Sequence, residues 1–292
     1  MNTQQIETLV AQGGPEPEQY EALTGFINRL YEQRLLPNGS VAINRFYKLL
    51  GDAISTTETL QGLSACKPHG YPGDFEIIDK IYAEHKTPLF RLRKWDDFFH
   101  AQSAPKAVRN RKLYFSKLLD RMTAVLPEMS VLNISSGPGR CMKTWMENNP
   151  DNHVNIDCIE HDPNAIAFSK SINKPYLDKI SFKEKSLLKY RPQTQYHLIW
   201  ASGIFDYFSD NLFKGIVERL LPAVRPGGSL VIGNFATGNP SRAYMELLGK
   251  WTLNHRSPNQ LIELCSGLVN DVSRIRIEKE SEGVNLFLHI DK

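Results

Sequence analysis

The 292-residue chain has few of the residues that mark metal sites and disulfide frameworks. It contains four cysteines, and none of them stands in the C-x-x-C spacing that zinc sites and redox motifs use. The sequence also has no window of about 18 apolar residues, which a transmembrane helix needs. Its N-terminus lacks the basic and apolar segments of a secretion signal. We therefore expect no metal site, no membrane span and a cytoplasmic location.

A large excess of charge of either sign is also missing. Lys and Arg number 35 against 32 Asp and Glu, which gives a net charge of +3, and no run of basic residues forms a patch. Nucleic-acid binding therefore has no support, because such proteins carry a basic stripe or face. The length is enough for one large domain, or for one domain with a helical extension.

The spacing of the apolar residues divides the chain into two parts. Up to about residue 122 the spacing is helical, as in the segment with Leu23, Ile27 and Leu30 on one side. From about residue 129 short apolar runs alternate with helical stretches. We therefore predict a helical region over residues 1–122 and a second domain over residues 123–292.

The second part predicts an α/β fold. Alternating strands and helices are typical of a mostly parallel sheet with helices on both faces. The last two strands follow each other without a helix, and the turn between them contains a glycine, which predicts an antiparallel hairpin at the edge. The seven predicted strands are 130–135, 153–160, 179–185, 196–202, 228–235, 272–280 and 284–290. The predicted helices are Arg140–Asn148, Asn164–Ser171, Asp210–Val224, Ser241–Leu248 and Asn259–Ser266.

A glycine-rich loop follows the first predicted strand, in "VLNISSGPGRC". Glycines at this place let the backbone approach a ligand beyond the carboxyl ends of the strands. The dinucleotide fingerprint needs a third glycine, where this chain has Met142, so a pyrophosphate ligand is disfavoured. Glu160 ends the second strand, where an acid can bind a ribose. Together these residues predict a site for a nucleoside without a diphosphate.

At this point the sequence resembles the class I S-adenosylmethionine (SAM) methyltransferases, on "LNISSGPGR", "IEHDPNAI", "KSLLKY", "LIWASGIFDYF" and "VRPGGSLVIGNF". The resemblance implies a Rossmann-like sheet over residues 122–292, with SAM as cofactor. One departure is Asn133, where the family often has an acid. The implied cofactor-binding residues are Asn133, Ser135, Gly137, Pro138, Gly139, Glu160, Asp162, Pro163, Ser186, Leu187, Ala201 and Ser202.

The segment "HGYPGDFEIIDKIY" narrows the resemblance to a bacterial subgroup whose best-described members are the extracellular-factor methyltransferases, linked to 3-hydroxypalmitic acid methyl ester. It implies an N-terminal helical cap and a small-molecule acceptor, such as a carboxylate or a hydroxy fatty acid. A second relative, the azetidine-2-carboxylate synthases, cyclises the aminobutyl arm of SAM and releases methylthioadenosine. A SAM-binding module without turnover is a third hypothesis, and a homodimer stays open.

The sequence indicates the catalytic residues less clearly than the cofactor-binding residues. Our candidates for the catalytic and acceptor site are His69, Tyr71, Tyr207, Asn234 and Tyr244. Tyr71 is expected to lie over the acceptor space, whereas Asp74 is expected to cap the helix that follows it.

Several arginines have two interpretations each. Arg242 or Arg256 is either a carboxylate clamp or a partner in a salt bridge. Arg109 and Arg111 have a functional interpretation, in which they anchor the cap or bind an acceptor. In the other interpretation they belong to the solvated face of a helix.

Overall fold

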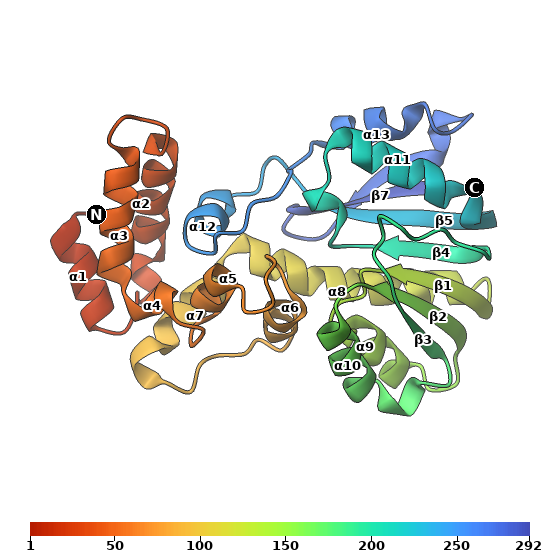
Figure 1. Ribbon diagram of the computed structural model, residues 1–292, viewed down its shortest axis with the longest axis horizontal. Coiled ribbons are helices and arrows are strands. Elements are labelled where there is room, and N and C mark those ends of the chain that lie inside the picture. The colour runs from red at the N-terminus through yellow and green to blue at the C-terminus, as the bar shows by residue number, and fades with distance from the viewer. The chain divides into compact units, whose positions relative to one another are not determined.

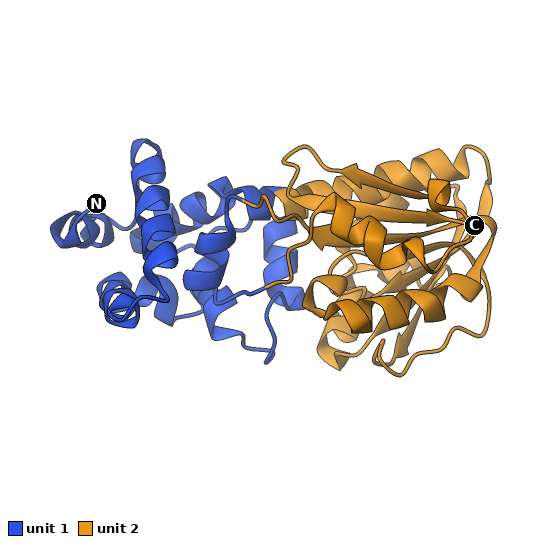
Figure 2. Cartoon of the chain, turned by 90° about the horizontal axis from the view of Figure 1, so that it is seen from above, with its two compact units in different colours: residues 1–106, 240–252 blue, residues 107–239, 253–292 orange.

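The computed structural model describes residues 1–292 and divides them into two compact units. Unit 1 consists of residues 1–106 and 240–252, and unit 2 of residues 107–239 and 253–292 (Figure 2). The sequence places the boundary near residue 122, whereas the division lies inside the long helix α8 (Ser103–Thr123). Since a helix is continuous through its own hydrogen bonds, its apolar spacing gives no sign of such a boundary.

Unit 1 is helical, as its apolar spacing predicts. Asp74 caps the helix α6 (Phe75–Tyr82) as expected, because its Oδ1 accepts hydrogen bonds from the N–H groups of Glu76 and Ile77, each at 3.0 Å. No helix of the chain is both long enough and apolar enough to cross a bilayer. The helices of this unit besides the start of α8 are α1 (Thr3–Ala11), α2 (Tyr20–Gln33), α3 (Gly39–Leu50), α4 (Asp52–Ser55), α5 (Leu60–Cys66), α6 (Phe75–Tyr82), α7 (Arg93–Ala101) and α12 (Arg242–Leu247).

The segment 240–252, which contains α12, belongs to unit 1 because hydroxyl groups of the earlier helices hold it. Tyr47 Oη donates to the carbonyl of Leu247 at 2.7 Å, and Ser64 Oγ donates to the carbonyl of Gly249 at 3.0 Å. Tyr31 Oη donates to the Glu246 carboxylate at 2.7 Å. These bonds join positions about 200 residues apart in the chain, so local sequence patterns do not reveal them.

Unit 2 contains a seven-stranded sheet in the order β3-β2-β1-β4-β5-β7-β6 (Figure 1). The first five strands are parallel, and β7 lies antiparallel between β5 and β6. The predicted fold, a Rossmann-like mostly parallel sheet with an antiparallel edge hairpin, is confirmed. The strands are β1 (Glu128–Ile134), β2 (His153–Glu160), β3 (Ile180–Glu184), β4 (Tyr196–Ala201), β5 (Val224–Phe235), β6 (Ile275–Lys279) and β7 (Asn285–Asp291). The helices are α9 (Arg140–Asn148), α10 (Pro163–Ile172), α11 (Asp210–Leu220) and α13 (Pro258–Ser266), with short 3-10 turns between elements.

Each face of the sheet has its own apolar core. Leu132 and Ile134 of β1 pack in one core with residues of α11 and α13. Val131 packs in the other core with Phe115 of α8 and Trp145 of α9. Since side chains alternate along a strand, this division assigns a face to every position of β1.

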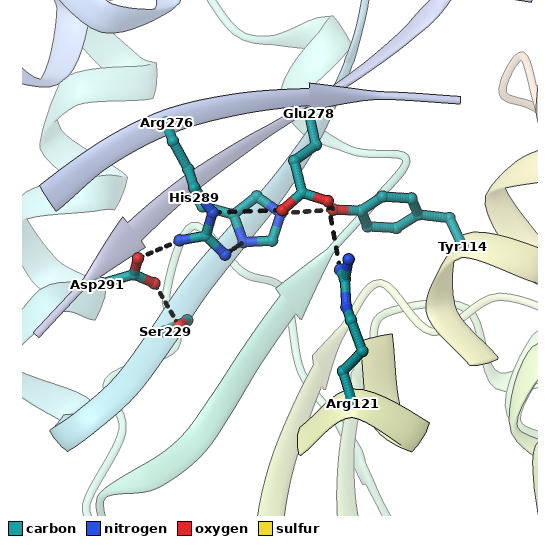
Figure 3. A network of polar contacts seen from close by, with 7 residues as sticks. All are labelled: Tyr114, Arg121, Ser229, Arg276, Glu278, His289 and Asp291. Carbon is teal, nitrogen blue, oxygen red and sulfur yellow. Dashed lines mark hydrogen bonds and ion pairs between the residues drawn. The ribbon is translucent and has the colours of Figure 1, made fainter. Parts of the chain in front are cut away.

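A polar network joins α8 to the edge hairpin (Figure 3). Tyr114 Oη lies 2.6 Å from both the Glu278 carboxylate and His289 Nε2, and Arg276 donates to His289 Nδ1 at 2.8 Å. His289 is completely buried, and burial followed by the charge of Arg276 lowers its pKa to about 4. The geometry therefore indicates a neutral imidazole with its proton on Nε2.

Candidate functional site

The loop of residues 135–139 connects β1 to α9 through backbone conformations that favour glycine. The φ angles of Ser135, Gly137 and Gly139 are 51°, 54° and 73°. The two glycines differ in their surroundings. A Cβ on Gly139 would lie 2.0 Å from Ser169 Oγ, so this glycine lets the loop pack against α10. A Cβ on Gly137 would meet no atom within 4 Å, so the space above this residue is open to a ligand.

Glu160, the last residue of β2, lies beside this loop. Its Oε2 accepts a hydrogen bond from the N–H of Gly137 at 3.0 Å, and its Oε1 accepts from the N–H groups of His161 and Asp162 at 2.7 and 3.1 Å. Burial alone would raise the pKa of Glu160, but these bonds and the His161 side chain outweigh it and lower the pKa. The carboxylate is therefore ionised, and its Oε2 can accept a further hydrogen bond.

His161 is a neighbour of this acid that the sequence analysis did not select. Its Nδ1 lies 3.0 Å from Glu160 Oε1, and this carboxylate raises the pKa of His161. The sequence could have indicated this contact, because His161 directly follows the acid in "IEHD".

Four further predicted cofactor residues have visible structural roles. Asp162 accepts from the N–H of Asn164 at 2.8 Å, and Pro163 is the first residue of α10, so this pair starts the helix. Leu187 is buried in the core on the α11 side, and Ser186 Oγ accepts from the N–H of Leu188. Whether these residues also contact a cofactor stays a prediction, as it does for the buried Pro138.

Asn133, the departure from the family pattern, is 3% exposed. Its Nδ2 has no hydrogen-bond partner in the protein. Because a buried amide without a partner carries a desolvation cost, this group is a donor with capacity for an acceptor outside the protein, either a water molecule or a ligand.

The end of β4 is held by a buried arginine. Arg111 Nη1 donates to the carbonyl of Ser202 at 2.6 Å, directly after the fully buried Ala201. Arg111 is 7% exposed, so it does not belong to a solvated helix face. Tyr207, in the turn that follows, is partly buried against the core on the α11 side.

Asn234 and Arg256 form a second buried cluster near the end of β5. Arg256 Nη1 donates to Asn234 Oδ1 at 2.8 Å, and Asn234 Nδ2 donates to the carbonyl of Asn254 at 3.0 Å. Arg256 Nη2 also pairs with Asp210 at 3.0 Å. For Arg256 the salt-bridge interpretation therefore has a visible partner, and Arg242 likewise pairs with Glu246 at 2.8 Å.

The remaining candidates lie in unit 1. His69 Nε2 lies 3.2 Å from the Glu76 carboxylate, while Tyr71 is half-buried. Tyr244 is buried and donates its hydroxyl hydrogen to Gln61 Oε1 at 2.7 Å. The structure shows these local contacts, and the catalytic roles of all three stay predictions.

Comparisons with solved structures support the fold. No protein-family model matches the chain, and no curated protein sequence matches it. A possible exported protein from Bordetella parapertussis is similar at a TM-score of 0.68 and 18% identity, over 95% of this chain and 99% of that one. A presumed O-methyltransferase from Nostoc punctiforme is similar at a TM-score of 0.55 and 15% identity, over 83% of this chain and 72% of that one. At these identities the likenesses show the fold alone.

Proposed function

We propose that this chain is a SAM-dependent methyltransferase that acts on a small-molecule acceptor. The observation that carries the proposal is the contact between Glu160 and Gly137, at 3.0 Å. It places an ionised carboxylate beside a glycine with open space above it, at the carboxyl ends of β1 and β2. This is the place where open α/β sheets bind their ligands.

The side chains present fit a SAM molecule. Glu160 has acceptor capacity for a ribose hydroxyl, and Gly137 leaves room for the ligand to approach the backbone. The unpartnered Nδ2 of Asn133 is a donor for a polar group of the ligand. A nucleoside that carries a polar amino-acid end matches such a set of acceptors and donors.

When bound, SAM would supply an electrophilic methyl group. The contribution of the chain is then mainly to hold the acceptor in line and to exclude water. We propose a carboxylate acceptor, because the resemblance to the extracellular-factor subgroup implies one. A carboxylate is already ionised near pH 7, so its methylation needs no general base. Burial raises the pKa of Asp206 to about 6, but this residue is 2% exposed and accepts from the N–H of Phe235 at 2.6 Å. Asp206 therefore supports the end of β5 rather than serving as a base.

The test is incubation of the pure protein with SAM, with and without an acceptor panel of 3-hydroxy and unsubstituted fatty acids, followed by mass spectrometry. S-adenosylhomocysteine that forms only with an acceptor is the expected result. Methylthioadenosine without any acceptor would instead favour the cyclase. Tight SAM binding without turnover would favour a binding module. A cytoplasmic location and a homodimer stay predictions.

A further inference from the structure

The edge of the sheet at β3 carries an excess of positive charge. Residues 170–191 run from the end of α10 through β3 into the loop before β4, and they contain seven Lys and Arg against two Asp and Glu. The net charge of this segment is therefore +5, whereas that of the whole chain is +3. No two of these cations are adjacent in the sequence, so they form no basic run. They are Lys170, Lys174, Lys179, Lys183, Lys185, Lys189 and Arg191.

These cations surround a strand that has a neighbour on one side only, because β3 is the outermost strand of the sheet (Figure 1). Six of the seven are exposed. Three of the exposed ones, Lys174, Lys185 and Lys189, have no ion-pair partner. Lysines on an edge strand hinder its pairing with another strand, but only Lys183 lies on β3 itself. Protection of the edge therefore does not account for most of this charge.

Two leucines are exposed within the same segment. Leu177, which precedes β3, is 42% exposed, and Leu188, which follows it, is 50% exposed. On β3 the ring of Phe182 is half-buried, and the Nζ of Lys170 lies 5.9 Å from its centre. Exposed apolar side chains among lysines are typical of surfaces that bind a bilayer, because the apolar groups enter the headgroup region and the lysines attract anionic lipids.

We propose that this β3 surface, formed by the seven cations with Leu177 and Leu188, docks on a bilayer that contains anionic lipids. The kind of cation favours a bilayer over other anionic partners, since six of the seven are lysines. Lysine is a hydrated point charge on a flexible chain, which suits a diffuse anionic surface. Protein interfaces are instead depleted in lysine, and arginine is preferred where nucleic acids are recognised.

Docking at this edge would bring lipid close to the proposed nucleoside site. Glu184, the last residue of β3, pairs with Glu160 at the end of β2, so the carboxyl end of β3 lies beside that site. A fatty acid concentrates in a bilayer because its chain is apolar. The bilayer would then be a source of the acceptor. The docking itself goes beyond the proposed function, because it requires neither SAM nor turnover.

The test is co-sedimentation of the full chain with vesicles of phosphatidylcholine, and with vesicles of equal parts phosphatidylcholine and phosphatidylglycerol. We expect binding to the anionic vesicles only, and weaker binding at high salt, because salt screens exposed charges. The variant Lys174→Gln/Lys185→Gln/Lys189→Gln removes the three cations that have no ion-pair partner. Its partition coefficient should fall about a hundredfold, at about fivefold for each cation.

The matched control is Lys117→Gln/Lys214→Gln/Lys279→Gln, which removes three exposed lysines of the same unit, on α8, α11 and β6. The net charge changes equally, but vesicle binding should stay close to that of the wild type. Equal losses in the two triple variants would overturn the assignment of the surface. Leu177→Ser/Leu188→Ser should weaken binding to anionic vesicles severalfold, most clearly at high salt, because it removes the apolar anchors. Unchanged binding of this variant would contradict the insertion of the leucines.

Two further probes represent the other anionic partners, namely polyglutamate for an acidic protein and a DNA duplex for a nucleic acid. Each is titrated with the same variants by fluorescence anisotropy, and we expect weaker binding to both than to anionic vesicles. If the wild type binds either probe through the three lysines but does not bind vesicles, the proposal is wrong. Absence of binding to vesicles and to both probes would contradict it equally. Calorimetry with S-adenosylhomocysteine, without vesicles, tests the proposed function separately.

Discussion

The substitutions Gly137→Ala and Gly139→Ala should differ in their effects, because the first should mainly lower ligand affinity and the second should mainly lower the free energy of unfolding. A Cβ at position 139 would lie 2.0 Å from Ser169 Oγ and 2.9 Å from Asn173 Nδ2. Overpacking of this kind costs about 1–3 kcal/mol, and the left-handed φ adds about 1–2 kcal/mol. Gly139→Ala should therefore lower the free energy of unfolding by about 2–5 kcal/mol. Gly137→Ala meets no atom within 4 Å and carries only the backbone cost, about 1–2 kcal/mol.

Affinity for S-adenosylhomocysteine should respond differently at the two positions. The methyl group of Gly137→Ala enters the open space of the proposed ligand site, so the affinity should fall although most of the stability remains. Urea unfolding gives the stability of each variant, and calorimetry at a temperature where each is folded gives the affinity. Equal losses of stability at both positions would refute the packing argument. Unchanged affinity in Gly137→Ala would refute the assignment of the loop to the ligand.

Four further predictions each concern one residue. The pKa of His289 is about 4 in the folded protein, against an ordinary value of 6.5 that applies to the unfolded chain. As the pH falls, the imidazole is therefore protonated in the unfolded chain before it is protonated in the folded protein. The unfolding free energy of the wild type relative to His289→Gln should therefore fall as the pH drops from 6.5 to 4, as measured by urea titrations at several pH values. Tyr244→Phe leaves the buried Gln61 without its donor and should cost about 1–3 kcal/mol in urea unfolding; a fall in kcat at unchanged stability would instead favour its catalytic role. Arg256→Lys cannot reproduce the bonds to Asn234, Asp210 and the backbone, so it should cost about 3 kcal/mol or more, seen as a lower urea midpoint. Glu160→Gln should weaken adenosine-containing ligands about tenfold in calorimetry, because it removes the ionised acceptor.

The sheet could be predicted because each of its strands is marked locally. The predicted and observed bounds of β2 and α9 agree, and β7 differs from its prediction by one residue at each end. A buried strand between turn residues has a period and a length that the sequence shows directly. At β6 the prediction began too early, because residues 272–274 form a 3-10 turn before the strand. Its apolar Val272 is exposed, so composition alone was misleading there.

The contacts of the candidate catalytic residues and of Arg256 were harder to predict. Arg256 binds Asn234 across 22 positions, and Tyr244 binds Gln61 across 183 positions. The types of these residues fit both a substrate site and a buried hydrogen bond, and only the tertiary contacts show their partners. Glu160 could be selected as a candidate in advance, because it ends the strand that follows the glycine loop, and its contact with the Gly137 N–H is seen, whereas its contact with a ligand stays a prediction.

The most direct test of the central claim is a calorimetric titration of S-adenosylhomocysteine into the wild type and into Glu160→Ala. The account predicts one binding site per chain in the wild type, competition by adenosine, and a large loss of affinity in a folded Glu160→Ala protein. An absence of binding to the wild type, or equal affinity in the two proteins, would contradict the assignment of a nucleoside site to Glu160 and the glycine loop.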